Sequence, residues 1–159
     1  AKLNHLNAHY IGQMEDHGLA KLAAPFVAKE LGRDLNDDEL QKLEKALPDI
    51  KPRVQLLTEI ADMSLFYFKR LELSDKAQEV LTQEARAHLT ALRPALEKLE
   101  AWTQDEIKNT IRDYTKEKEI KLGVIAPPLR AALTGGSAQL PVFAVAALLG
   151  REETLARLP

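Results

Sequence analysis

The chain has 159 residues, of which 45% are hydrophobic and 29% charged, and its 22 Lys and Arg nearly balance its 24 Asp and Glu to a formal net charge of −2. This composition is typical of a folded globular protein, and it excludes both a disordered chain and a nucleic-acid binder that relies on bulk positive charge. Because the sequence has no cysteine, disulfides and thiolate metal sites are excluded as well.

The first predicted helix covers residues 2–14, where apolar side chains recur every three or four positions, as on one face of a helix. It carries His5 and His9, whose spacing would let both rings share a metal ion. No third histidine or carboxylate completes a metal-binding motif, so ordinary surface histidines are the better interpretation, and we predict no metal site.

Two further helices are predicted before residue 50. Asp16 is a candidate cap for a helix that ends at Leu31, with Pro25 inside it as a kink or a break. Asn36 and the acidic residues that follow it predict a second capped helix, which ends at Pro48.

Residues 49–68 combine a proline turn with the densest group of aromatic residues. Pro52 predicts a short helix, and the cations Lys51 and Arg53 flank it. Such cations can hold phosphate or base edges, although a solvated surface pair is the commoner outcome. Phe66 and Phe68 would suit stacking on bases, but their helical spacing beside leucines indicates a core.

The middle of the chain predicts a long helix that begins at Ser74 or Asp75 and is interrupted by Pro94. Trp102 follows, and packing between helices is the favoured interpretation over stacking on a base. We place a boundary there, between helical subdomains over 1–101 and 102–159.

A second predicted helix in this region runs from a capping box formed by Thr103 and Glu106 towards Ile120. Its mixed charges indicate a solvated face with salt bridges.

Residues 121–159 contain the sharpest turns. Gly123 predicts the end of a helix, and Pro127 with Pro128 predicts the start of a short one that carries Arg130 in its first turn. An arginine beside a helix N-terminus is suited to gripping an anion such as phosphate. Residues 142–149 then predict a buried apolar helix that Gly150 ends.

No segment alternates as a strand does, so the sequence predicts an all-α fold, a multi-helix bundle of two packed subdomains. The sequence also lacks a Gly-x-Ser-x-Gly elbow and a phosphate-binding glycine loop. We therefore predict no catalytic residue and no cofactor in this chain.

Several short motifs resemble, in order and spacing, the C-terminal anticodon-binding region of bacterial glutamyl-tRNA synthetases, which are class I aminoacyl-tRNA synthetases. Together they span nearly the whole chain. The motifs are Lys2-Leu3-Asn4-His5-Leu6-Asn7 with Tyr10-Ile11, Lys51-Pro52-Arg53, Lys121-Leu122-Gly123, Pro128-Leu129-Arg130, Ala132-Leu133-Thr134-Gly135 and Leu148-Leu149-Gly150.

The resemblance implies a role in recognition. In the intact enzyme a catalytic half activates glutamate with ATP and Mg²⁺, and its two signature motifs are missing from this sequence, so we expect the chain alone to be inactive. The implied partners are the tRNA(Glu) anticodon loop and the catalytic domain of the same enzyme. No apolar run approaches the roughly 18 residues of a membrane span, so we expect no membrane contact. We also expect the protein to be cytoplasmic, as a synthetase would be, and monomeric. The sequence begins with Ala1 and not with methionine, which indicates a fragment or processed product.

The resemblance also carries over five candidate anticodon contacts: Lys51, Arg53, Arg130, Gln139 and Val142. Placed at the third anticodon base, Arg53 would match the acceptors of cytosine and oppose the donors of guanine, which favours discrimination for glutamate alone. The family usually shows a Ser-Pro-Gly-like turn before the last buried helix. Here residues 139–142 read Gln-Leu-Pro-Val, with the proline displaced by one position.

A different class of function fits the composition equally well: a non-catalytic helical module that binds another protein. The salt dependence of binding distinguishes the two functions. On a plot of log affinity against log salt concentration, RNA binding falls with a slope of about 0.7 to 0.9 per neutralised phosphate, whereas binding through an apolar protein interface hardly changes. A third interpretation is a chain that binds tRNA too weakly alone, since the intact enzyme also holds other parts of the tRNA.

Overall fold

The computed structural model describes residues 8–136 and 139–159. The described residues lie in helices and turns, and none of them lies in a β-strand, which confirms the all-α prediction. Packing divides the chain into two compact units, Ala1–Lys69 and Arg70–Pro159. This division falls earlier than the predicted boundary between 1–101 and 102–159. Trp102 lies inside the second unit, where its Nε1 donates to the Ala146 carbonyl at 2.9 Å.

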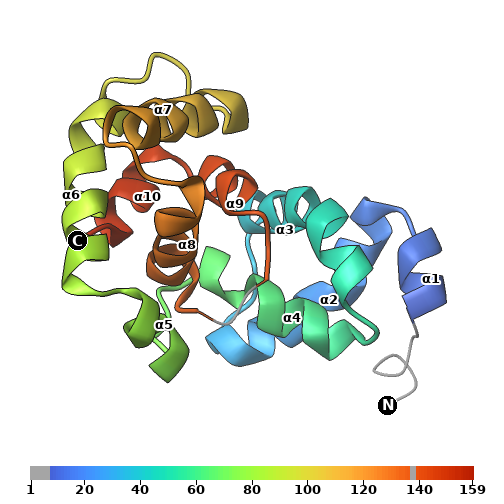
Figure 1. The fold of residues 1–159 in the computed structure, drawn as a ribbon. Helices are drawn as coiled ribbons and strands as arrows, with labels where there is room; N and C mark the ends of the chain where they lie inside the picture. Colours follow the sequence, from blue (N-terminus) through green and yellow to red (C-terminus); the bar gives the residue numbers. More distant parts are fainter. Residues whose placement is uncertain (1–7, 137–138) are drawn as a thin grey trace. The chain divides into compact units, whose positions relative to one another are not determined.

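The first unit is built on α2, which packs against both α3 and α4 (Figure 1). Phe66 is buried, which confirms the core prediction for that ring, whereas Phe68 is only partly buried. Tyr67 is buried as well, and burial raises the pKa of its hydroxyl. The described helices of this unit are α1 (Ala8–Gln13), α2 (Asp16–Leu31), α3 (Asp37–Ile50), η2 (Lys51–Arg53), α4 (Leu57–Ser64) and η3 (Leu65–Tyr67), where η marks a 3₁₀ helix.

The predicted start of α3 is confirmed. The Asn36 side chain accepts from the Glu39 backbone N–H at 2.8 Å, and the Glu39 carboxylate accepts from the Asn36 N–H at 3.1 Å. This reciprocal capping box satisfies two backbone donors that the helix itself leaves unpaired.

Three predicted boundaries in this unit are wrong. Asp16 does not cap α2; Glu15 occupies the cap position, and Asp16 is the first helical residue. The alternative of a break at Pro25 is wrong, because α2 continues through it, while the alternative of a kink stays a prediction. The helix α3 continues through Pro48 to Ile50. Each of these prolines removes one backbone hydrogen bond from its helix, and packing against neighbouring helices outweighs that loss. His5 and the rest of residues 1–7 lie outside the described residues.

In the second unit α6 contacts α7, α8 and α10, and α9 packs on α7 and α8 (Figure 1). Val142, Val145, Ala146 and Leu149 are buried along α9, as the apolar run predicted. The described helices of this unit are α5 (Asp75–Val80), α6 (Gln83–Glu97), α7 (Gln104–Glu117), η4 (Leu122–Val124), α8 (Ala126–Thr134), α9 (Val142–Leu149) and α10 (Arg151–Arg157).

The predicted long helix after Ser74 is two helices. Ser74 caps α5 as expected, through a bond from the Ala77 N–H at 3.1 Å. The chain then leaves the helix at Leu81, and Thr82 caps α6 through the Ala85 N–H at 3.1 Å. The break predicted at Pro94 is wrong, because α6 continues past it to Glu97.

The region around α7 follows the prediction at its start and departs from it at its end. Thr103 accepts from the Glu106 N–H at 3.2 Å, which is one half of the predicted capping box, but α7 ends at Glu117, before Ile120. Gly123 does not end a helix; it lies in η4. Within the described part of the chain, no ion pair joins the cations of α7 to a carboxylate, so its charged face is solvated without the expected salt bridges.

The turns around α8 and α9 are confirmed and depend on glycine. Pro127 and Pro128 lie at the start of α8, and Gly150 ends α9. Gly135 and Gly136 have φ of 81° and 98° after α8. A Cβ on Gly136 would lie 2.5 Å from the Cβ of Ala77, so this turn presses directly against α5.

The C-terminal helix α10 is held by arginines. Glu153 accepts from Arg70 Nε at 2.9 Å and from Arg157 Nε at 2.8 Å. Arg157, whose side chain is 5% exposed, also donates to the Leu133 carbonyl at the end of α8 at 2.6 Å. The Arg70 and Arg157 guanidinium groups lower the pKa of the Glu153 carboxyl to about 2.

We expect Gly136→Ala to destabilise the protein by about 1 to 3 kcal/mol, because the added methyl group meets Ala77 and Ser74 and the positive φ is strained for alanine. Gly18→Ala is the control. Gly18 lies inside α2 with open space around it, and that change should stabilise by about 0.4 to 1 kcal/mol. Urea unfolding of both variants tests this, and equal effects would contradict the packing of the glycine turn.

A second prediction concerns acid stability. Because the folded-state pKa of Glu153 lies below its unfolded value, its contribution is complete above about pH 4.3 and is lost as the pH falls towards 2. Glu153→Gln should therefore lower the free energy of unfolding by about 1 kcal/mol at pH 7 and by less at pH 3. The expected change is small because the Glu153 side chain is 35% exposed and solvent screens its ion pairs. Glu152→Gln, which removes an exposed carboxylate on the same helix, should leave the pH profile unchanged.

Candidate functional site

The Lys-Pro-Arg turn is η2, which follows α3 without a gap. Lys51 Nζ donates to the Met14 carbonyl at 2.5 Å and to Asp16 Oδ1 at 2.9 Å. Its side chain is 17% exposed. The ammonium group therefore ties the turn to the end of α1 and the start of α2, and little of it faces solvent.

Arg53 differs from Lys51, because its side chain is exposed. Its Nη1 donates to the Asp49 carbonyl at 2.6 Å, and the next residue, Val54, is buried. Pro52 restricts the backbone on the other side. The guanidinium group thus starts from a backbone that is anchored before and after it, which gives the side chain a defined direction.

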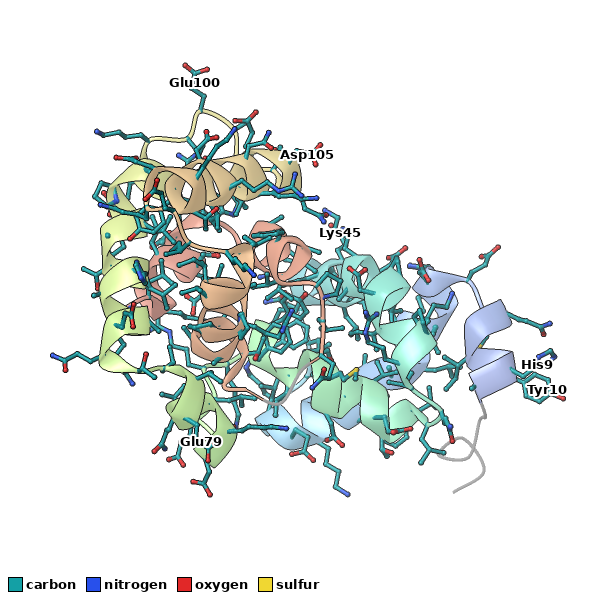
Figure 2. All side chains as sticks on the ribbon, viewed as in Figure 1. His9, Tyr10, Lys45, Glu79, Glu100 and Asp105 are labelled. Carbon is teal, nitrogen blue, oxygen red and sulfur yellow. The ribbon has the colours of Figure 1, made fainter. Side chains whose placement is uncertain are left out.

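A hollow of about 510 Å³ lies beside this turn, lined by Ala8, Gly12, Asp16, Pro48, Lys51 and Pro52. Its walls are small or apolar residues with one charged pair. His9 and Tyr10, on another part of α1, point outward in Figure 2, and their rings meet edge to face at 5.7 Å. Tyr10 is 56% exposed. The turn and α1 together therefore offer an apolar surface, an arginine and exposed aromatic rings.

The other predicted residues lie in the second unit. Arg130 is half-buried, and its Nε donates to the Leu140 carbonyl at 2.9 Å. It therefore braces the residue that precedes Pro141 and α9. Arg130 and the exposed Gln139 line one groove of about 170 Å³, together with Lys76, Pro127 and Gly136. Val142 is 4% exposed, so its side chain is part of the core.

The structure thus brings Lys51 together with Arg53, and Arg130 together with Gln139. The two pairs belong to different units, each with its own hollow. Two residues beside these sites were not predicted from the sequence to belong there: Asp16, which was interpreted as a helix cap, and Lys76 on α5. No local pattern marks the contact between Asp16 and Lys51, because the two residues are far apart in the sequence.

Neither hollow has the features of a metal centre. In the described ranges no group of three or more His, Cys, Asp or Glu side chains converges on a point where a metal ion could bind. Across those same ranges, no helix is both long and apolar enough to cross a membrane.

Comparison with known proteins identifies related chains. A family model described as "Anticodon binding domain" matches residues 18–159. Glutamate–tRNA ligase 2 of Rhodospirillum centenum is 46% identical over 160 residues, which cover 99% of this chain and 34% of that protein. Glutamate–tRNA ligase of Azorhizobium caulinodans is 42% identical, with coverage of 99% and 35%. The chain spans about a third of the length of these relatives.

The fold also matches a solved structure. A crystal structure of a glutamate tRNA ligase from Elizabethkingia meningosepticum in complex with its amino acid superposes with a TM-score of 0.82 and 23% identity. The match covers 96% of this chain and 30% of that one. At this identity the likeness establishes a shared fold.

We expect Lys51→Met to lower the free energy of unfolding by about 1 to 3 kcal/mol, because the change leaves the partly buried Asp16 carboxylate and the Met14 carbonyl without their shared donor. Lys45→Met is the matched control. Lys45 is exposed on α3, and its loss should stay within about 0.5 kcal/mol. Urea denaturation followed by circular dichroism measures both, and equal effects would show that the Lys51 contacts do not contribute.

Proposed function

This chain belongs to the family of anticodon-binding domains, and from that premise we propose that it binds the anticodon loop of tRNA(Glu) as the C-terminal part of a glutamate–tRNA ligase. The observation that carries the proposal is the family match over residues 18–159. The match includes the Lys-Pro-Arg turn and the whole second site, whereas Ala8, Gly12 and Asp16 beside that turn precede it. The ligase relatives, which the chain matches over about a third of their length, support the choice of glutamate.

The geometry around Arg53 suits an unpaired base. Bases in a single-stranded loop can be turned outward and read along their pairing edges, whereas the major groove of an RNA duplex is too narrow for side chains. The Arg53 guanidinium is exposed on an anchored turn, beside a hollow with apolar walls. We propose that it donates to the two acceptors of a cytosine at the third anticodon base. Guanine presents N–H donors at that edge and repels it.

The second unit supplies a separate contact. Arg130 holds the Leu140 carbonyl, and this fixes the backbone on which the exposed Gln139 stands. A Gln amide both donates and accepts hydrogen bonds, so it suits a base edge. We propose that Arg130 and Gln139 contact another part of the loop, and that Val142 contributes through packing, because its side chain is buried.

The remaining activities are assigned to other parts of the ligase. We propose that a catalytic domain, absent from this chain, binds ATP, Mg²⁺ and glutamate, and that this chain is inactive alone. The ligase then acts in the cytoplasm, where its tRNA is charged, and functions as a monomer.

The test is a binding titration against two anticodon stem-loops that differ only in cytosine or guanine at the third anticodon base, each at two salt concentrations. We expect tighter, salt-sensitive binding of the cytosine loop. Arg53→Gln should remove this preference at a cost of about 1 to 3 kcal/mol. Arg112→Gln, which removes an exposed cation of α7, should keep the preference.

Three outcomes count against the proposal. If the folded chain binds neither loop, anticodon recognition by this chain alone is rejected. If it binds a protein partner with an affinity that hardly responds to salt, the alternative of a helical protein-binding module is favoured. Equal binding of both loops would reject the assigned role of Arg53 while leaving RNA binding intact.

A further inference from the structure

The hydrogen bonds of Lys51 leave it poorly placed to bind RNA. An ammonium group has three donors, and two of them are directed at the Met14 carbonyl and Asp16 Oδ1, at 2.5 Å and 2.9 Å. The side chain is 17% exposed. The Asp16 carboxylate neutralises the charge of Lys51, and a phosphate that approached Lys51 would also meet this carboxylate. The second cation of the Lys-Pro-Arg turn is therefore directed into the protein.

The ion pair of Lys51 and Asp16 lies between two helix ends, and the dipoles of both helices stabilise it. Lys51 is the C-cap of α3, where the helix dipole favours a positive charge, and Asp16 is the first residue of α2, where the dipole favours a negative one. A single contact thus joins the C-terminus of α3 to the N-terminus of α2. The Met14 carbonyl, just after α1, adds a third segment to the same ammonium group.

The contacts of Lys51 with Asp16 and Met14 restrict the backbone of Arg53, which is only two residues away. Pro52 lies between the two residues with its φ restricted by the ring, and the Val54 N–H closes the turn on the Lys51 carbonyl at 3.5 Å. Val54 is itself buried. The backbone of Arg53 is consequently held between the Lys51 contacts on one side and the core on the other.

We propose that Lys51 is a positioning residue: through Asp16 and the Met14 carbonyl it sets the direction in which Arg53 meets a base, and it makes no contact with RNA itself. This inference rests on the proposed function, and it revises the prediction that Lys51 is an anticodon contact. It also assigns a role in specificity to Asp16, an acidic residue that a search for RNA-binding cations passes over.

The experiment compares Lys51→Met, Asp16→Asn and Lys51→Arg with the wild-type chain in the titration of the two stem-loops. The salt slope reports phosphate contacts, and the ratio of the two affinities reports the direction of Arg53. For Lys51→Met and Asp16→Asn we expect an unchanged salt slope and a cytosine preference reduced by about threefold or more. Lys51→Arg, which can still pair with Asp16, should keep most of the preference. Lys45→Met controls for the loss of a lysine.

Two results would overturn the inference while wild-type binding is intact. A direct phosphate contact by Lys51 predicts that Lys51→Met lowers the salt slope by about 0.7 and leaves the preference unchanged. The same contact predicts tighter binding of both loops by Asp16→Asn, because the lysine is then released. If Lys51→Met does not fold, the Asp16→Asn and Lys51→Arg variants decide. Absence of wild-type binding would reject the proposed function, and this inference with it, before any variant is compared.

Discussion

Backbone carbonyls at the ends of short helices need hydrogen-bond donors, and this requirement organises both units. An α-helix leaves its last four carbonyls without partners inside the helix, and short helices joined by tight turns multiply such groups. Cationic side chains from other segments supply many of the donors here. The pairs at helix ends are Lys51 with Met14, Arg93 with Leu155 and Arg157 with Leu133, and, within one continuous segment, Arg53 with Asp49. Arg130 does the same for a loop carbonyl, that of Leu140.

This use of cations changes how the charges of the chain are interpreted. The formal net charge of −2 gives no overall attraction to a phosphate backbone, and several of the cations are directed at the protein's own backbone. What such a protein can offer RNA is a small number of donors held in fixed directions. Base reading depends on direction more than on total charge, so the arrangement is consistent with the proposed recognition of single bases.

Several turns of the protein are fixed by close packing or by side-chain hydrogen bonds. Gly136 packs against Ala77 of α5 with no room for a side chain, and Gly135 lies close to Leu71 and Glu72. Arg130 braces the residue before Pro141. In the first unit the pair of Lys51 and Asp16 does the same for η2. In each case the residue proposed to meet a base, Gln139 or Arg53, stands next to an anchored position. Pro141, the proline that the resemblance predicts to be displaced, directly follows the Leu140 anchor.

Much of the helical pattern could be predicted from the sequence, because it depends on neighbours in the chain. Asn36, Ser74 and Thr103 begin helices by bonding backbone N–H groups three residues ahead, and the residue types alone indicate this. Prolines were weaker guides. Pro25, Pro48 and Pro94 lie inside helices, because packing against neighbouring helices compensates for one missing hydrogen bond.

The all-α class, several helix starts and the motifs that point to a family of anticodon-binding domains follow from residue type and local spacing, so they can be inferred from the amino-acid sequence. The partners of the cations cannot be inferred in this way, because they depend on how the helices pack. Asp16 and Lys51 meet across two helices, and Arg130 reaches Leu140 across a turn. No pattern of neighbouring residues encodes such contacts, because they arise when separate helices pack and the remaining carbonyls and carboxylates require donors.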